Sequence, residues 1–226
     1  MKNGVGFECE YNLYDYNDEL FNTLQISFPK TLLCAVPKRK AEFLAGRFVV
    51  KQAINMLDIE PLEISIGLHR APQWPNGIVG SISHSGNKAF CFLSQFSSRV
   101  GIDYEEFISN KIAEEIKYSI ISVEEEQLCS SSEYSFNQIL TMIFSAKESL
   151  FKALYPSVKR YFDFLDVRVL TISNSVPIEQ KKYHGKYSSV TLQLQTDLSS
   201  ELCDGLSFKL YYQWRENGVL TFIENQ

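Results

Sequence analysis

Two acidic residues in the middle of the chain have a spacing that suits metal binding. Asp103 and Glu105 lie two residues apart in the run Arg99-Val-Gly-Ile-Asp-Tyr-Glu105, which is typical of a short strand. The two-residue period of a strand places both carboxylates on one face. Two acids side by side repel each other unless a cation or a proton separates them.

A third carboxylate, Glu148, lies next to Lys147 and four residues before Lys152. Mg²⁺ binds hard oxygen ligands, usually keeps some of its waters and shares phosphate oxygens with a substrate. Three carboxylates with lysines nearby therefore predict a magnesium–phosphate site whose ligands are Asp103, Glu105 and Glu148.

The periodicity predicts a helix from Phe136 to Tyr155, ended by Pro156. Its main apolar stripe recurs at three- and four-residue spacing: Ile139, Ile143, Ala146, Leu150 and Ala153. Glu148 lies nearly opposite that stripe, on a face shared with Phe144, Phe151 and Tyr155. A carboxylate sheltered by aromatic rings has a raised pKa unless a cation neutralises it, which suits a metal ligand or a general base. The alternative is an exposed ion pair of Glu148 with Lys152.

These segments resemble the signature of the 4′-phosphopantetheinyl transferases. The resemblance is carried by Gly101-Ile-Asp-x-Glu105 and by Phe144-Ser-Ala-Lys-Glu-Ser-x-x-Lys152. Upstream, 37–47 and 70–85 look like the first and second motifs of the enterobactin-synthase branch, and Lys159-Arg-Tyr-Phe-Asp-Phe164 continues the pattern. Residues before about 30 and after about 172 carry no motif of the family.

The resemblance implies an α+β fold of two similar lobes related by a pseudo-twofold axis, with the active site in the cleft between them. The coarse pattern agrees, because a helix followed by strands occurs twice, before and after residue 103. We expect an N-terminal lobe over residues 1–102, which grips coenzyme A, and a C-terminal lobe over 103–226, which carries the acids.

The resemblance also implies the reaction. The serine hydroxyl of an apo acyl, peptidyl or aryl carrier protein attacks the β-phosphate of coenzyme A, and 3′,5′-ADP leaves. Asp103, Glu105 and Glu148 are expected to hold Mg²⁺, for which Mn²⁺ is expected to substitute. Glu148 is the expected general base, and Lys152 and Lys147 the expected phosphate-binding cations.

Five residues of the N-terminal half are expected to bind coenzyme A by the same resemblance. Arg39 and Arg47 would hold its 3′-phosphate, Ser83 and His84 its other phosphates, and Arg70, chosen over its neighbour His69, would supply a further cation. Alternatives remain for two of them. Arg47 lies at the edge of an apolar helical stripe and is typical of an arginine that covers the core rim. A lone histidine such as His84 is usually structural.

The remaining elements follow from periodicity and turn residues. We expect a helix over 38–58 opened by Pro37, a short helix over 122–129 with the capping box Ser122-x-x-Glu125, and a loop or hairpin connection over 174–187. The helix stripe consists of Phe43, Val50, Ile54 and Leu57. Strands are expected at 62–67, 78–83, 88–94, 99–105, 165–173, 187–195 and 205–224.

Composition narrows the class of protein. The 226 residues are 45% hydrophobic, so the chain can bury a stable core without a disulfide or a structural metal. A net charge of −5 argues against a nucleic-acid partner. The five cysteines form no Cys-x-x-Cys pair, which favours reduced, mostly buried thiols and a cytoplasmic protein. Neither a leader nor an apolar run long enough to span a bilayer is recognised.

Two other functions fit the same residues. One is a different magnesium-dependent nucleotide phosphatase, and the other is a non-catalytic protein that binds coenzyme A or a carrier. The enterobactin-like motifs favour a transferase that serves siderophore or other nonribosomal-peptide synthesis. For carrier docking we consider the segment 130–136, with Tyr134 and Phe136 as apolar anchors; the alternative is an ordinary loop with Phe136 in the core.

Overall fold

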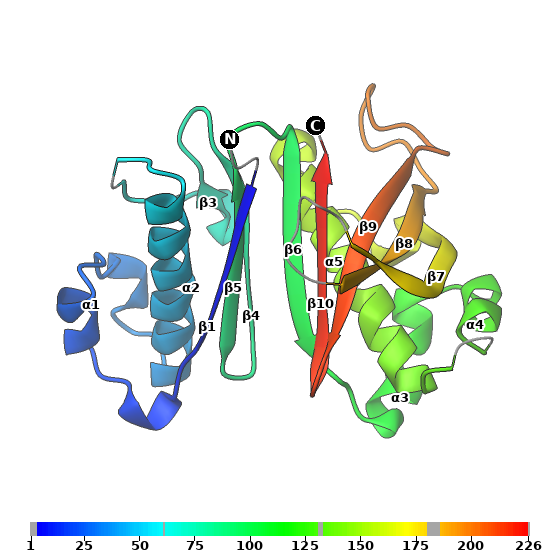
Figure 1. Cartoon of the computed structure of the whole chain (residues 1–226), viewed down its shortest axis with the longest axis horizontal. Helices are drawn as coiled ribbons and strands as arrows, with labels where there is room; N and C mark the ends of the chain where they lie inside the picture. The colour runs from blue at the N-terminus through cyan, green and yellow to red at the C-terminus, as the bar shows by residue number, and fades with distance from the viewer. Residues whose placement is uncertain (1–3, 61, 131–132, 180–185, 226) are drawn as a thin grey trace. The chain divides into compact units, whose positions relative to one another are not determined.

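The computed structural model of the chain describes residues 4–60, 62–130, 133–179 and 186–225. It divides into two compact units, one of residues 1–100 with 225–226 and one of residues 101–224. The sequence predicted a boundary at 102/103. Each unit contains helices and sheet (Figure 1), so the predicted α+β class is confirmed. The pseudo-twofold relation and the cleft stay predictions.

The N-terminal unit is built on a three-stranded antiparallel sheet in the order β1-β5-β4, formed by β1 (Gly4–Glu10), β4 (Val79–Ser85) and β5 (Lys88–Ser94). A two-stranded ribbon pairs β2 (Ser65–Ile66) with β3 (Pro72–Gln73). Its helices are α1 (Glu19–Thr23), α2 (Pro37–Met56) and the single turns η1 (Leu13–Asp15), η2 (Lys30–Leu32) and η3 (Leu68–Arg70). Strand β1 was not expected from the sequence.

Helix α2 packs on β5 and β1 (Figure 1). Its buried face includes Val50 and Ile54 of the predicted stripe together with Leu44, Val49 and Ala53. The other two residues of the stripe, Phe43 and Leu57, are only half-buried. Gly46 lets the helix come close to β4, since a Cβ there would lie 3.2 Å from Ile82 Cγ2.

The C-terminal unit carries a five-stranded sheet in the order β6-β10-β9-β8-β7. The strands are β6 (Arg99–Glu106), β7 (Val167–Glu179), β8 (Lys186–Leu194), β9 (Ser207–Arg215) and β10 (Gly218–Asn225). The helices are α3 (Asn110–Ile120), α4 (Val123–Ser130), α5 (Phe136–Val158) and the turn η4 (Phe164–Asp166). The run predicted as one strand over 205–224 is thus a hairpin of β9 and β10. Strand β7 extends to Glu179, into the loop predicted over 174–187. Residues 180–185 of that loop lie outside the described residues.

Helix α5 forms as its periodicity predicts, and all five residues of its apolar stripe are buried. Its end differs from the prediction. Pro156 lies within the helix, which continues to Val158 and closes at Lys159, whose backbone is left-handed and donates to Tyr155 O. Proline disrupts a helix because it has no backbone N–H and because its ring crowds the preceding turn. Pro156 lies near the C-terminal end of α5, where its missing N–H removes one hydrogen bond.

Two contacts fix α5 against the sheet. The hydroxyls of Ser145 and Ser149 lie 2.9 and 2.7 Å from Thr221 Oγ1 on β10. Gly101 on β6 leaves no room for a side chain, because a Cβ there would lie 1.9 Å from Ser149 O. Helix α5 and strand β6 are therefore held in direct backbone contact, and these two elements carry the predicted acids.

The predicted capping box of α4 is present, with Ser122 N donating to Glu125 Oε2 at 2.8 Å. Helix α3 was missed by the sequence reading, although its N-cap Ser109 accepts from Ile112 N. All five cysteines are free thiols; Cys91 and Cys129 are buried, but Cys34 and Cys203 are exposed, so the prediction of mostly buried thiols was too broad. Across the described residues, every helix is too short or too polar to cross a bilayer.

Candidate active site

The N-terminal unit has a cavity of about 550 Å³ that gathers most of the basic residues predicted to bind coenzyme A. Arg39 and Arg47 reach it from α2, His84 from β4 and Arg70 from η3. Four side chains from three elements therefore converge on one concave surface. Such a concentration of donors suits a phosphate-bearing ligand.

Arg39 is oriented by two neighbours. Its Nη1 lies 3.2 Å from His84 Nε2 and 3.5 Å from Glu42 Oε2. A guanidinium can only donate, so in this contact Nε2 accepts, which requires an imidazole with its proton on Nδ1. Glu42 was not singled out in the sequence, although its i,i+3 spacing from Arg39 is the signal for such a pair.

Arg47 is half-buried and lies over the Phe43 ring, with Cζ 4.7 Å from the ring centroid. Burial lowers the pKa of the Arg47 guanidinium, Glu63 opposes that shift, and the neighbouring Arg39 adds to it. Two cations held side by side with incomplete solvation form a site that an anion would stabilise.

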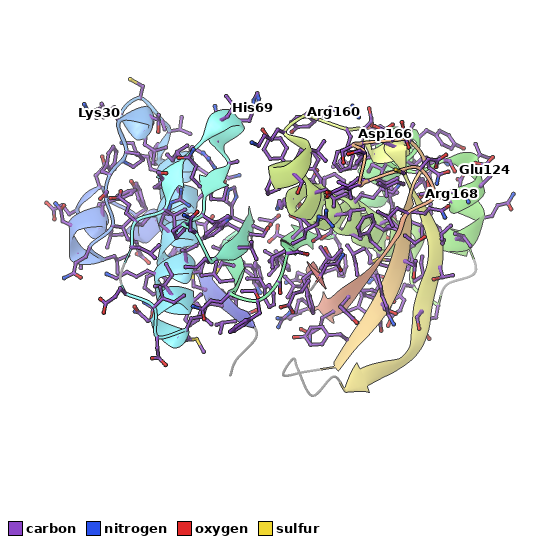
Figure 2. All side chains as sticks on the ribbon, turned by 90° about the horizontal axis from the view of Figure 1, so that it is seen from above. Lys30, His69, Glu124, Arg160, Asp166 and Arg168 are labelled. Carbon is purple, nitrogen blue, oxygen red and sulfur yellow. The ribbon has the colours of Figure 1, made fainter. Side chains whose placement is uncertain are left out.

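His69 and Arg70, the two candidates for a further phosphate contact, lie in one tight turn. His69 and Arg70 both have left-handed backbones, with φ of 53° and 64°, and bulky residues rarely adopt this region. The turn is closed by Gly67 N donating to Ala71 O at 2.8 Å. Both residues are exposed, but Arg70 lines the cavity and His69 does not. Figure 2 shows His69 at the surface of the N-terminal unit.

Ser83 does not join this group. Strand β4 alternates, so Ile82 and His84 line the cavity while Ser83, on the other face, is 4% exposed and buried. The structure thus separates Ser83 from the other predicted coenzyme A-binding residues of this unit.

In the C-terminal unit, β6 and α5 bring Asp103, Glu148 and Lys152 together. Asp103 is 2% exposed, and its Oδ1 lies 2.6 Å from Lys152 Nζ. Glu105, two residues along β6, is on the same face as Asp103 by the strand period. The exposed ion pair considered for Lys152 is not what forms, since its ammonium contacts Asp103 and the carbonyl of Ile102.

Glu148 is half-buried. Burial raises the pKa of the Glu148 carboxyl, the charge of Lys152 lowers it, and the Asp103 carboxylate raises it. Phe144 and Phe151 flank this part of α5 and are themselves half-buried, as predicted. A carboxyl whose pKa is raised by its surroundings is a better proton acceptor than an exposed one, and is the kind of group expected at a catalytic site.

The negative charge of the acids suits a divalent cation, but their side chains are not already arranged to coordinate one. Asp103 raises the pKa of Glu148, so a cation next to both would relieve their repulsion. Yet among the described residues, no three His, Cys, Asp or Glu side chains are arranged to hold a metal ion. Mg²⁺ needs only one or two carboxylates when waters and substrate phosphates complete its shell, so the residues remain compatible with it.

Lys147, predicted to bind phosphate, lies in a buried network of contacts. It is 1% exposed, and its Nζ lies 2.9 Å from Glu125 Oε1, 2.7 Å from Ile120 O and 3.1 Å from Phe164 O. These acceptors use all three protons of an ammonium. Lys147 is therefore committed to a buried network that joins α5 to α3, α4 and η4, and the geometry argues against phosphate binding.

A small cavity of about 180 Å³ adjoins Glu148. Its walls are largely aromatic, formed by Phe151, Tyr161, Phe162 and Phe164. Tyr161 is 78% exposed, with its ring 4.9 Å from that of Phe151. Figure 2 shows the neighbouring Arg160 and Asp166 on the segment that follows α5. The Glu148 carboxyl thus has apolar surface beside it.

The predicted docking anchors are only partly available. Tyr134 is half-buried, with its ring centroid 4.5 Å from that of Trp214, and Phe136 packs against the core. Residues 131–132, in the middle of this segment, lie outside the described residues. The observed packing of Phe136 agrees with the ordinary-loop alternative.

Comparison with known proteins assigns the family. Residues 28–94 match the 4′-phosphopantetheinyl transferase N-terminal domain, and residues 99–205 match the 4′-phosphopantetheinyl transferase superfamily. The chain belongs to the 4′-phosphopantetheinyl transferase family. The first match contains the residues that line the basic cavity, and the second contains Asp103, Glu105 and Glu148.

Particular relatives support the enterobactin-like motifs. Enterobactin synthase component D of Salmonella typhi is 42% identical over 116 residues, which are 51% of this chain and 48% of that protein. The protein of the same name from Escherichia coli K12 is 37% identical over 134 residues, 59% of this chain and 63% of that one. 4′-Phosphopantetheinyl transferase PptT of Mycobacterium tuberculosis is 28% identical over 139 residues, 60% of each. The chain thus spans about half the length of the Salmonella relative and less than two thirds of the others.

Proposed function

We propose that this protein transfers the 4′-phosphopantetheine arm of coenzyme A to the serine hydroxyl of an apo acyl, peptidyl or aryl carrier protein and releases 3′,5′-ADP. The observation that carries the proposal is the convergence of Arg39, Arg47, Arg70 and His84 on one cavity. Family membership supports the same activity.

The cavity supplies the binding energy for the nucleotide end of coenzyme A. Arg39 and Arg47 would bind the 3′-phosphate, since paired guanidiniums form strong charge-assisted hydrogen bonds with phosphate oxygens. His84 would exchange its contact with Arg39 for one to a phosphate and take up a proton. Binding at one end of the substrate then positions the pyrophosphate for reaction.

The acidic residues of the C-terminal unit, together with Lys152, would carry out the phosphoryl transfer. In the reaction the serine oxygen forms a bond to the β-phosphorus, the bond from that phosphorus to the bridging oxygen breaks, and 3′,5′-ADP leaves with the electron pair. Glu148 takes the serine proton, and its raised pKa suits that task. Lys152 would turn from Asp103 toward the charge that develops on the leaving phosphate.

Magnesium is the metal we propose for this site, held by Asp103, Glu105 and Glu148. When bound, it supplies charge neutralisation and Lewis acidity at the pyrophosphate. Asp103 is buried and its Oδ1 contacts the Lys152 ammonium, so a metal bound there would compete with that lysine for the carboxylate. Mn²⁺, which also prefers oxygen ligands, should substitute.

The names of two relatives support the proposed pathway. Both are called enterobactin synthase component D, so we propose a role in siderophore or other nonribosomal-peptide synthesis. The free thiols of all five cysteines support a cytoplasmic location. The carrier protein is the macromolecular partner.

The decisive experiment incubates the protein with coenzyme A, Mg²⁺ and a panel of apo carriers, and records intact masses. We expect each accepted carrier to gain one phosphopantetheine arm, and the gain to disappear with chelator. Consumption of coenzyme A without a carrier would favour the phosphatase alternative. Tight binding of coenzyme A with no product on any carrier would favour the non-catalytic one.

Binding to the cavity can be tested apart from turnover. Cys34 lines this cavity and is exposed, whereas Cys203 is exposed in the other unit. We expect 3′,5′-ADP, which has no thiol, to slow alkylation of Cys34 and to leave Cys203 unchanged. Equal rates at both thiols with and without nucleotide would contradict the proposed location.

A further inference from the structure

A second cavity lies beside the proposed coenzyme A cavity, within the N-terminal unit. It has a volume of about 590 Å³, within the range of small-molecule sites. The loop before α2, the helix itself and the segment after it enclose it. Seven of the described lining residues are aliphatic: Ile26, Pro29, Val50, Ile54, Leu62, Ile64 and Ile66.

The charged residues of this cavity are mainly basic. Lys30, Arg47 and Lys51 line it, and Glu63 is the one acidic residue among the described residues that do so. Lys51 Nζ donates to Leu24 O at 2.9 Å and to Gln25 Oε1 at 3.2 Å, which leaves one of its three protons for a ligand. Lys30 is exposed on its turn (Figure 2). An apolar body with one negative charge complements this lining.

Arg47 belongs to both cavities. It lines each of them together with Thr31, Phe43 and Ile66, so these residues form the common wall. Its guanidinium lies over Phe43, and burial lowers the pKa of Arg47. A carboxylate on either side of the wall would stabilise this poorly solvated cation.

We propose that the second cavity binds a small amphipathic monoanion, an aliphatic chain ending in one carboxylate, with the chain against the aliphatic lining and the carboxylate on Arg47 and Lys51. A single carboxylate matches the donors that these two residues offer. The second cavity is distinct from the cavity proposed for coenzyme A, but Arg47 lines both of them.

Sharing Arg47 has a consequence for regulation, which rests on the proposed function of the first cavity. A guanidinium drawn to a carboxylate on one side is less available to the 3′-phosphate on the other. The two ligands should therefore weaken each other's binding by the same factor, as linkage requires.

The binding test is calorimetric titration of the ligand-free protein with decanoate. Decanol, of equal chain length but uncharged, and decyltrimethylammonium, of opposite charge, are the controls. We expect saturable binding of one decanoate and at least about tenfold weaker binding of both controls, because a charge-assisted contact is lost. Equal affinity for decanol would overturn the proposed role of Arg47 and Lys51, and absence of saturable decanoate binding would overturn the site.

Location is tested with tryptophan substitutions that fill the cavity. Asn55, on α2, and Ser27, in the segment before it, line the cavity and are exposed, so Asn55→Trp and Ser27→Trp should fold. Met56, the next residue on α2, is 44% exposed and outside the lining, so Met56→Trp is the matched control. We expect about tenfold loss of decanoate affinity in both filling variants and none in the control. Unchanged affinity in both filling variants would place decanoate elsewhere.

Coupling is then measured by titrating 3′,5′-ADP with and without saturating decanoate. We expect decanoate to weaken 3′,5′-ADP binding severalfold in the wild type and not in Asn55→Trp. Independent binding of the two ligands would refute the coupling through Arg47. If 3′,5′-ADP does not bind at all, the proposed function fails, while the decanoate titration still tests the second cavity.

Discussion

Lys152 Nζ lies 2.6 Å from Asp103 Oδ1 and thereby joins α5 to β6. Asp103 is almost fully buried, and the Lys152 side chain is 27% exposed. A buried carboxylate is costly without a partner, so the lysine stabilises the ionised acid while keeping part of its length in solvent. The same lysine lowers the pKa of Glu148. One cation thus balances two acids, and any second cation that enters would compete with it.

Replacing each acid tests the proposed chemistry. We expect Asp103→Ala, Glu105→Ala and Glu148→Ala each to abolish transfer to a carrier while the protein stays folded, because removing one like charge relieves repulsion. Intact-mass analysis of the carrier measures transfer, and thermal unfolding checks the fold. Wild-type turnover in any of the three would remove that residue from the catalytic group.

The raised pKa of Glu148 predicts how stability depends on pH. A carboxyl whose pKa is raised by folding favours the folded state while it is protonated, and that contribution is lost as pH rises through the folded pKa. In chelator, Glu148→Gln should therefore match the wild type below the ordinary carboxyl pKa of 4.5 and become the more stable protein at neutral pH. Chemical denaturation between pH 4 and 8 gives the comparison, and a difference independent of pH would contradict the shift.

The 3′-phosphate contact is tested on the two arginines of α2. Arg39→Ala and Arg47→Ala should weaken coenzyme A binding about ten- to a hundredfold, since each removes a charge-assisted contact of about 1.5–3 kcal/mol. The loss should shrink greatly for 3′-dephospho-coenzyme A. Lys38→Ala, at an exposed neighbouring position of the same helix, is the control. Equal losses for both ligands would show that these arginines read another part of coenzyme A.

Residue spacing within single segments predicted much of the secondary structure. The stripe of α5 and the capping box of α4 were predicted because both depend on spacing within one helix. The family motifs pointed to most of the basic residues that line the cavity, and of the pair His69 and Arg70 only Arg70 lines it. A phosphate contact of Arg70 stays a prediction.

Two predicted site residues lie away from their sequence neighbours. The family resemblance placed Ser83 with His84, and Lys147 was expected to bind phosphate with Lys152, but both side chains are buried. Successive residues point to opposite faces of a strand and about 100° apart on a helix, so the neighbours face different surroundings. The partner that holds Lys147 is Glu125, on another helix, and no periodicity within one segment reveals such a pair.

The buried network of Lys147 predicts a structural phenotype. Lys147→Met leaves the Glu125 carboxylate buried without its cation and should cost about 3–5 kcal/mol of unfolding free energy. Adding Glu125→Gln should recover most of that loss, because the remaining carbonyl oxygen can still accept from Val169 N. Urea denaturation measures both variants. The double variant should also keep a wild-type Michaelis constant for coenzyme A, and a large increase would return Lys147 to the phosphate-binding group.

The contact of Gly101 with α5 predicts that the smallest possible addition disturbs the site. In Gly101→Ala the new Cβ would meet Ser149 O at 1.9 Å, so β6 and α5 must separate. We expect at least about 1–3 kcal/mol of destabilisation, as for other overpacked cores, and a loss of turnover, since Asp103 and Glu148 would move apart. Gly6→Ala on β1 is the matched control, because its Cβ would have ordinary contacts at 3.6 Å or more and should change stability by no more than about 0.5 kcal/mol. Thermal unfolding and carrier modification, measured on both variants, would contradict the prediction if Gly101→Ala behaved like Gly6→Ala.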